Sequence, residues 1–208
     1  MPKVLLTGFE PFDGASSNPS QVVVETLGKG HQPSCDLKTL VLPVDRKQAA
    51  PKLLSAMRSH EPDLVLMMGV APRPQIAPER VAINVDDYRI PDNAGNQPAG
   101  VPIIEGGPVA YFSSLPVKAI ETSLRAHKVP CTVSNSAGTY LCNHVFYQAM
   151  HFIATNGLQT KAGFIHLPFF HEHVIDQQKT PSLAEGTVVE GIDLALETCL
   201  AAVQVSAV

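Results

Sequence analysis

Three residues with the chemistry of acyl transfer lie far apart in the chain: Glu79, Cys142 and His166. A cysteine thiolate is a nucleophile, a histidine can take up and return its proton, and a carboxylate can orient the histidine ring. Cys142 falls in the first turn of a predicted helix, where free backbone N–H groups lower a thiol pKa and could hold an oxyanion. These residue types indicate a cysteine hydrolase, provided that the fold brings them together.

Each of these residues also has an ordinary structural interpretation. Most free cysteines are small buried hydrophobic residues, and a lone histidine is commonly hydrogen-bonded within a core. Glu79 stands beside Arg80 and is then simply an exposed glutamate. Considered without their neighbours, the three residues leave both interpretations open.

A metal site is a further alternative. Zinc-binding residue types recur in the second half of the chain, at Cys142, His144, His166, His171, Glu172 and His173. However, His171-Glu172-His173 lacks the i, i+4 spacing of a His-Glu-x-x-His helix, and no pair of cysteines supports it. We therefore predict no metal ligand and interpret His171 and His173 as part of a solvated loop. The glycines form no phosphate-binding loop, so no nucleotide cofactor is expected either.

The candidate residues must be positioned by a sheet, and short apolar runs predict its strands. Leu64–Gly69 is an unbroken apolar run, as expected of a strand that is covered on both faces of a parallel sheet. Functional side chains in such sheets gather at the carboxyl ends of the strands. The predicted strands are Lys3–Leu6, Leu37–Leu42, Leu64–Gly69, Val81–Val85, Cys131–Ser134 and Gly163–Leu167.

Helices are predicted between these strands. Asn18 is expected to cap a helix that runs to about Leu27 and stops at Gly28, and a capping box over Ser182–Glu185 is expected to open the last helix, which runs to about Val203. The other predicted helices are Asp45–His60, Val117–His127 and Tyr140–Ala154. This alternation predicts the α/β class, as a three-layer α/β/α sandwich around a mostly parallel, mixed and twisted sheet. We expect a single domain over residues 1–208.

Composition limits the function classes further. Only 16% of the 208 residues are charged and 45% are hydrophobic, with a net charge of −4 and no basic run, which argues against a nucleic-acid partner. No apolar run is long enough for a membrane helix, and no signal peptide is visible. The four cysteines are widely spaced, without a C-x-x-C pair or a secretory context, and are therefore expected to be thiols and not a disulfide framework. We therefore expect a cytoplasmic protein without membrane contact. The shortage of charge indicates surface that is buried between copies of the chain.

Several motifs together resemble those of the type I pyroglutamyl peptidases (pyrrolidone carboxyl peptidases), a family of cysteine peptidases. The resemblance runs from residue 4 to about residue 170. The motifs are Thr7-Gly8-Phe9-Glu10-Pro11-Phe12 with Asn18-Pro19-Ser20, Gly69-x-Ala71-x-Arg73 followed by Glu79-Arg80-x-Ala82-x-Asn84, Arg89-x-Pro91-Asp92-Asn93-x-Gly95, Ser134-x-x-Ala137-Gly138-x-Tyr140-x-Cys142-Asn143, and Gly163-Phe164-Ile165-His166-x-Pro168.

The resemblance implies a peptidase that removes an N-terminal pyroglutamyl (5-oxoprolyl) residue from peptides. Position by position, it implies Cys142 as the nucleophile, His166 as the base and Glu79 as the acid that orients the base. The implied intermediate is a thioester between Cys142 and the pyroglutamyl group. The resemblance also implies a single α/β/α domain, a homotetramer, and no metal or organic cofactor.

The resemblance further implies a pocket for the pyroglutamyl ring. Phe9 and Phe12 match rings that sandwich the substrate, Asn18 matches a polar residue close to it, and Arg89 matches an arginine near the oxyanion and the acyl pocket. Because pyroglutamate is a neutral, flat lactam, apolar walls and a few hydrogen bonds suit its recognition. Unpaired lactam-binding groups would then exclude substrates with other N-terminal residues.

Two positions depart from the family pattern. Val70 stands where many relatives have glutamine, and Pro72 where glycine is common before Arg73. If the glutamine side chain recognises the ring, binding is affected here, whereas recognition by the backbone alone is not. Two other functions therefore stay open: a lactam-binding protein without activity, and a thiol hydrolase of the same mechanism that acts on another small acyl group.

Overall fold

The computed structural model describes residues 1–30, 34–177 and 179–205. Its central sheet has five strands, of which four are parallel and the fifth, β4, is antiparallel to its neighbour β7. The order across the sheet is β2 (Asp36–Leu42), β1 (Lys3–Phe9), β3 (Leu64–Val70), β7 (Lys161–Leu167) and β4 (Ala77–Pro78).

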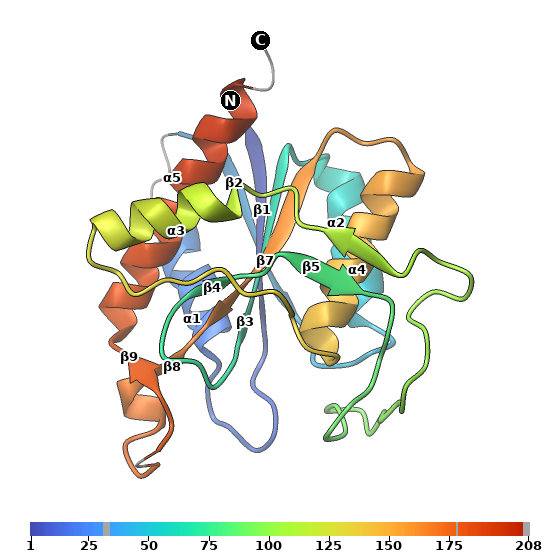
Figure 1. Ribbon diagram of the computed structural model, residues 1–208, viewed down its shortest axis with the longest axis horizontal. Helices are drawn as coiled ribbons and strands as arrows, with labels where there is room; N and C mark the ends of the chain where they lie inside the picture. Colours follow the sequence, from blue (N-terminus) through green and yellow to red (C-terminus); the bar gives the residue numbers. More distant parts are fainter. Residues whose placement is uncertain (31–33, 178, 206–208) are drawn as a thin grey trace.

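Helices cover both faces of this sheet. Figure 1 shows α1 (Pro19–Lys29), α3 (Val117–Ala126) and α5 (Glu185–Val205) on one side, and α2 (Ala49–His60) and α4 (Leu141–Thr155) on the other. The predicted three-layer α/β/α arrangement with a mixed, mostly parallel sheet is confirmed. Among the described residues, no helix has the length and apolar character needed to cross a membrane.

Alternate residues of the central strands face the two helical layers. In β3, Leu64, Leu66 and Met68 belong to the core beneath α1, α3 and α5, whereas Val65 and Met67 belong to the core beneath α2 and α4. All five are fully buried because successive side chains of a strand point to opposite faces, and both faces are covered.

Two small sheets flank the central one. β5 (Val81–Ile83) pairs with β6 (Ala110–Phe112) in an antiparallel ribbon, and β8 (Phe169–Phe170) pairs with β9 (Ser182–Leu183). The strand predicted over Val81–Val85 is therefore shorter than expected and lies outside the central sheet.

The strand predicted over Cys131–Ser134 does not form. This segment makes only two isolated bridges, from Cys131 to Ile76 and from Ser134 to Glu79. The Ile76 N–H donates to the Pro130 carbonyl, and the Arg80 N–H donates to the Ser134 carbonyl. Pro78 lies between these two donors and has no N–H to donate. The hydrogen-bond ladder is interrupted at that proline.

Helix α1 is longer than predicted. Asn18 caps it as expected, since its side chain accepts the Ser20 N–H, but the helix continues to Lys29. Gly28 lies inside the helix, where a Cβ would come within 3.0 Å of the Thr39 side chain, and Gly30 is the C-terminal cap. The glycine at the predicted end therefore provides close packing on β2.

Two other helices begin later than predicted. α2 starts at Ala49 rather than Asp45, because the Asp45 carboxylate accepts the Lys47 N–H and stabilises a turn before the helix. α5 starts at Glu185, and Ser182, the expected cap, pairs with Phe169 in β8 and β9 instead. The other helices and the four parallel strands of the central sheet lie close to their predicted positions, whereas β4, β6, β8 and β9 were not predicted.

Candidate active site

Cys142 lies in the first turn of α4, beside the carboxyl end of β3. A Cβ atom placed on Gly69 would come within 2.8 Å of the Cys142 Sγ and 2.9 Å of the Phe164 ring. Only glycine therefore allows the thiol to approach the sheet so closely. Gly69 is also the register partner of His166 in β7, so the cysteine and the histidine meet at the same edge.

Glu79 and His166 form a buried pair at this edge. Glu79 follows β4, its N–H donates to the Phe164 carbonyl at 2.8 Å, and its Oε1 lies 2.7 Å from the His166 Nδ1. Both side chains are almost completely buried. Because an ionised carboxylate can only accept hydrogen bonds, the Nδ1 carries a proton and a neutral ring keeps its Nε2 as an acceptor.

Burial controls the ionisation of the site. It raises the pKa of the Cys142 thiol to about 12, and the Glu79 carboxylate adds to this effect, while the backbone N–H of Cys142 and the Arg73 guanidinium oppose it. Burial also lowers the pKa of His166, which Glu79 counteracts in part. The helix N-terminus therefore acts on the thiol in the predicted direction but is outweighed. Both shifts favour the neutral forms of the thiol and the imidazole.

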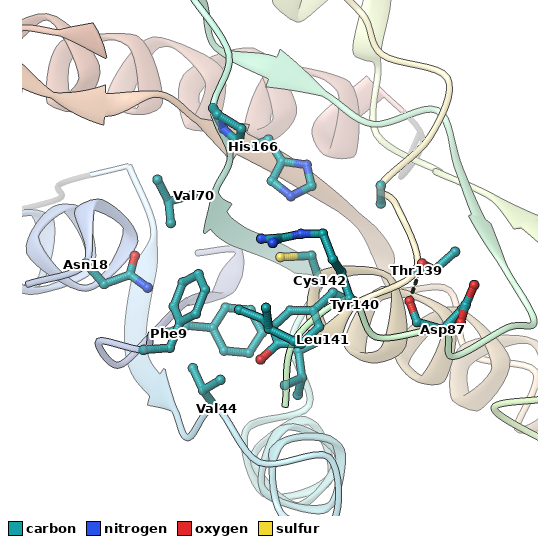
Figure 2. A pocket seen from close by; sticks show the side chains of 15 residues that line it. Phe9, Asn18, Val44, Val70, Asp87, Thr139, Tyr140, Leu141, Cys142 and His166 are labelled. Carbon is teal, nitrogen blue, oxygen red and sulfur yellow. Dashed lines mark hydrogen bonds between the residues drawn. The ribbon is translucent and has the colours of Figure 1, made fainter. Parts of the chain in front are cut away.

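A cavity of about 250 Å³ opens beside these residues. Figure 2 shows Cys142 and His166 pointing into it, with Phe9, Asn18 and Val70 on the opposite side. All residues that were predicted to act at the site line this cavity except Glu79, which lies buried behind His166: Phe9, Phe12, Asn18, Val70, Arg89, Cys142 and His166.

The sequence matches the family model described as pyroglutamyl peptidase over residues 2–202. The chain belongs to the pyroglutamyl peptidase family. Its members are cysteine-type hydrolases. The resemblance of the motifs to this family is thereby confirmed.

Individual relatives agree with this assignment. The pyrrolidone-carboxylate peptidase of Vibrio vulnificus (strain YJ016) is 49% identical to this chain over 201 residues, which cover 96% of this chain and 93% of the relative. The pyrrolidone-carboxylate peptidase of Thermococcus onnurineus is 47% identical over 201 residues, which cover 96% of this chain and 100% of the relative. The pyrrolidone carboxyl peptidase structure from Thermococcus litoralis has a TM-score of 0.95 at 38% identity, covering 99% of this chain and 96% of that one. Pyroglutamyl peptidase I of Bacillus amyloliquefaciens has a TM-score of 0.91 at 40% identity, covering 97% and 98%.

Most of the hydrogen-bonding capacity of the Asn18 side chain is used within the protein. Its Oδ1 accepts both the N–H and the hydroxyl of Ser20, at 3.0 and 2.8 Å, and its Nδ2 donates to the Glu10 carbonyl at 3.0 Å. Since a primary amide has two N–H bonds, one donor of Asn18 is left for a ligand in the cavity.

Several residues that line the cavity were not predicted from the sequence. Thr139 and Asp87 join the turn before α4 to the loop that carries Arg89, through a bond from the Thr139 hydroxyl to the Asp87 carbonyl at 2.7 Å and one from the Asp87 N–H to the Thr139 carbonyl at 3.0 Å (Figure 2). No local pattern reveals a contact across such a separation. The other lining residues that were not predicted are Val44, Pro72, Ile90, Ala137, Tyr140 and Leu141.

The two residues after Cys142 anchor the first turn of α4. The buried Asn143 amide accepts the Ile83 N–H and donates to the Ile83 carbonyl, both at 2.9 Å, so it pairs with β5 as a neighbouring strand would. The His144 Nδ1 lies 2.9 Å from the buried Asp86 carboxylate, which also pairs with Arg46 at 2.7 Å. The position of the thiol thus depends on contacts to β5 and to the loop after it.

Arg73 is a further residue to which the sequence assigned no role. Its Nη1 lies 3.0 Å from the Glu79 Oε1 that also faces His166. The motif Gly69-x-Ala71-x-Arg73 contained this residue, but nothing in its spacing indicated a contact with the acid.

Two histidines of the alternative zinc site, His171 and His173, lie apart from this arrangement. His171 and His173 form a short 3-10 turn, in which the His171 Nδ1 is 2.9 Å from the Ser182 hydroxyl and the His173 ring packs on Phe170. Across residues 1–30, 34–177 and 179–205, no group of three or more His, Cys, Asp or Glu residues is placed to hold a metal ion.

Proposed function

We propose that this pyroglutamyl peptidase removes the N-terminal pyroglutamyl residue of peptides with Cys142 as nucleophile, His166 as base and Glu79 as the residue that orients the base. The observation that carries the proposal is the 2.7 Å pair of Glu79 and His166 beside the cavity into which Cys142 also points. The orientation of the pair leaves the Nε2 of His166 free to accept the thiol proton.

The first half of the reaction forms a thioester. As the Cys142 sulfur attacks the pyroglutamyl carbonyl carbon, His166 takes the thiol proton, so no thiolate is needed beforehand. Backbone N–H groups at the start of α4, with Arg89 in the same cavity, hold the oxyanion. The C–N bond then breaks, and His166 returns the proton to the leaving amine. Water, deprotonated by His166, hydrolyses the thioester and regenerates the thiol.

The ring pocket suits an uncharged lactam. Phe9 and Phe12 provide aromatic walls, and Val70 adds an aliphatic contact in place of the polar side chain of many relatives. Asn18 lines the same cavity, and its second N–H would donate to the lactam carbonyl. A prolyl ring lacks the lactam carbonyl and would leave this donor unpaired. The pocket therefore favours pyroglutamate over a prolyl residue.

The proposal is tested with a pyroglutamyl anilide substrate. We expect Cys142→Ala, Cys142→Ser and His166→Ala each to reduce kcat/KM by about 10³-fold or more, because members of such a unit act together. Glu79→Gln is expected to keep residual activity, because Cys142 and His166 remain and only the support of the base by the carboxylate is lost. Circular dichroism checks that each variant is folded. Full activity of Cys142→Ala would overturn the mechanism.

A substrate panel separates this proposal from its alternatives. A lactam-binding protein without activity would turn over no substrate, and a hydrolase for another acyl group would prefer a different anilide. We expect the pyroglutamyl compound to be preferred, iodoacetamide to abolish turnover, and a chelator to leave it unchanged.

The surface and the thiols support two further parts of the proposal. We expect a homotetramer, because few residues are charged and the side chains of Val109, Phe112 and Ile175 are strongly exposed. A cytoplasmic location suits the four cysteines, all of which are free. Sedimentation at micromolar concentration is expected to show the tetramer, and a clean monomer would contradict it.

A further inference from the structure

We infer that Arg73 is a positioning residue for the proposed reaction: it supplies the countercharge of the buried Glu79 carboxylate, holds that carboxylate against His166, and ties it to the turn that precedes Cys142. This inference rests on the proposed function of the three residues. It adds a fourth side chain, which contacts the acid and not the substrate.

One oxygen of Glu79 makes all the contacts of this carboxylate. The Oε1 lies 2.7 Å from the His166 Nδ1 and 3.0 Å from the Arg73 Nη1, while the buried Oε2 has no hydrogen-bond partner among the described residues. Glu79 is fully buried, and the Arg73 side chain is 28% exposed. A buried carboxylate needs such a partner, because an unpaired charge is costly away from water.

The same guanidinium also reaches the segment before α4. Its Nη2 donates to the Ser136 carbonyl at 3.0 Å, in the turn that leads to Cys142. Arg73 stands between Pro72 and Pro74, and its N–H donates to the Ala71 carbonyl at 2.7 Å. Because prolines restrict both their own backbone and that of the preceding residue, little conformational freedom is lost when Arg73 is held in place.

The charge of Arg73 has a defined electrostatic effect on the site. The charged groups that face His166 and Cys142 are Glu79 and Arg73. Tyr140, whose own pKa is raised by burial, interacts with Cys142, and Asp87 and Arg89 also line the cavity. The Arg73 charge lowers the pKa of both His166 and Cys142. Removal of this charge therefore raises both values.

The acid limb of the pH profile reports the pKa of His166. Since His166 takes the thiol proton in its neutral form, activity is lost below the pKa of His166, and the acid limb moves to higher pH when this pKa rises. The raised thiol pKa acts instead on the reactivity of the free thiol. A purely structural role for Arg73 would lower the rate but leave the limb where it is.

The chain contains a matched control for this charge. Arg80 follows Glu79 directly, and its Nε donates to the Asn135 side chain at 2.9 Å, next to Ser136. Arg80→Gln therefore removes a cation and a link to the same turn, but it keeps the contact between Arg73 and Glu79.

The test compares Arg73→Gln, Arg73→Lys and Arg80→Gln in the full chain, with kcat/KM on a pyroglutamyl anilide measured from pH 5 to 9. We expect Arg73→Gln to move the acid limb up by about one pH unit, since removal of a nearby like charge favours the imidazolium and raises its pKa. Arg73→Lys is expected to keep the limb in place with a lower kcat, because one ammonium cannot bridge Glu79 and Ser136 as the guanidinium does. Arg80→Gln is expected to leave the limb unchanged.

A second readout does not depend on turnover. The rate of Cys142 alkylation by iodoacetamide at pH 8, located by mass spectrometry, follows the thiolate fraction, so Arg73→Gln is expected to slow it about tenfold. An unmoved acid limb in folded Arg73→Gln, an equal shift in Arg80→Gln, or a shift of a full unit in Arg73→Lys would each overturn the inference. Loss of the proposed function is recognised separately, by an inactive wild type or an active Cys142→Ala.

Discussion

At the scale of single residues, two features shape the site: the absence of a side chain at Gly69 and the protein environment of the Cys142 thiol. The missing side chain of Gly69 leaves room for both the Cys142 sulfur and the Phe164 ring. The surrounding protein keeps the thiol protonated, since burial raises its pKa to about 12. The Cys142 sulfur is thus packed closely against the sheet, and its raised pKa favours the protonated thiol. Each of these two properties leads to a prediction.

Gly69→Ala is expected to displace the thiol. Its Cβ would lie 2.8 Å from the Cys142 Sγ and 2.9 Å from the Phe164 ring, so one of them must move, at a cost of about 1–3 kcal/mol in stability. We expect kcat to fall more than KM rises. Gly186→Ala is the control, because a Cβ there meets nothing within 4 Å and α5 accommodates alanine. Steady-state kinetics and urea unfolding of both variants check this, and equal effects would contradict it.

The raised thiol pKa predicts how Cys142 reacts with iodoacetamide. Below its pKa the thiolate fraction of a thiol rises about tenfold per pH unit. We therefore expect the alkylation rate of the substrate-free enzyme to rise continuously between pH 6 and 9. A plateau near neutral pH would instead show a preformed ion pair of Cys142 and His166.

At the scale of elements, the first turn of α4 is fixed by its contact with the ribbon of β5 and β6. The Asn143 amide takes the place of a neighbouring strand along β5, and it does so directly beside the nucleophile. An isolated ribbon of two strands has little stability of its own. The helix and the ribbon therefore support each other.

Asn143→Ala is expected to cost about 2–4 kcal/mol, because it leaves half-buried backbone groups of Ile83 in β5 without these partners, and to lower kcat. The control is Asn156→Ala at the other end of α4, where the exposed amide donates to the Phe152 carbonyl and its loss should cost about 1 kcal/mol or less. Urea unfolding measures both values. Similar losses in the two variants would argue against the role of Asn143.

At the scale of the whole molecule, Asp86 connects three parts of the chain that are distant in sequence. Its fully buried carboxylate binds Arg46 from the segment before α2 and His144 from α4, and its backbone pairs with Val101. The loop that leads from Asp86 to Arg89 is thereby attached to the helical layer that carries the thiol.

Asp86→Asn is expected to destabilise the protein by about 2–4 kcal/mol, because it removes the charge that two buried or partly buried partners share. Asp87→Asn, at the exposed neighbouring carboxylate, should change stability by about 0.5 kcal/mol or less. The difference is measured by urea unfolding at 0.1 and 1 M salt. Since burial protects the pair from screening, a difference that vanishes at high salt would contradict this assignment.

The sequence by itself determined the α/β class, the helices, the parallel strands of the central sheet, and those cavity residues that the motifs carry, such as Cys142 and His166. Apolar runs such as Leu64–Gly69 carry that information locally, because the faces of a strand or helix repeat with a short period. The motifs around Glu79, Cys142 and His166 carried the family. Apolar runs and motifs both lie within short stretches of the sequence, so they can be recognised without the fold.

Only the tertiary structure decided how these parts contact each other. The pairing of Asn143 with β5 and the interruption of the Cys131–Ser134 pairing by Pro78 join segments that are distant in sequence. Arg73 and Glu79 are close in sequence, but nothing in their spacing indicates that they pair. Such contacts depend on the order and register of the strands, and a shift of one residue would turn every side chain of a strand to the other face. The chemistry of a residue can be recognised in the sequence, but its partner is known only once the sheet is assembled.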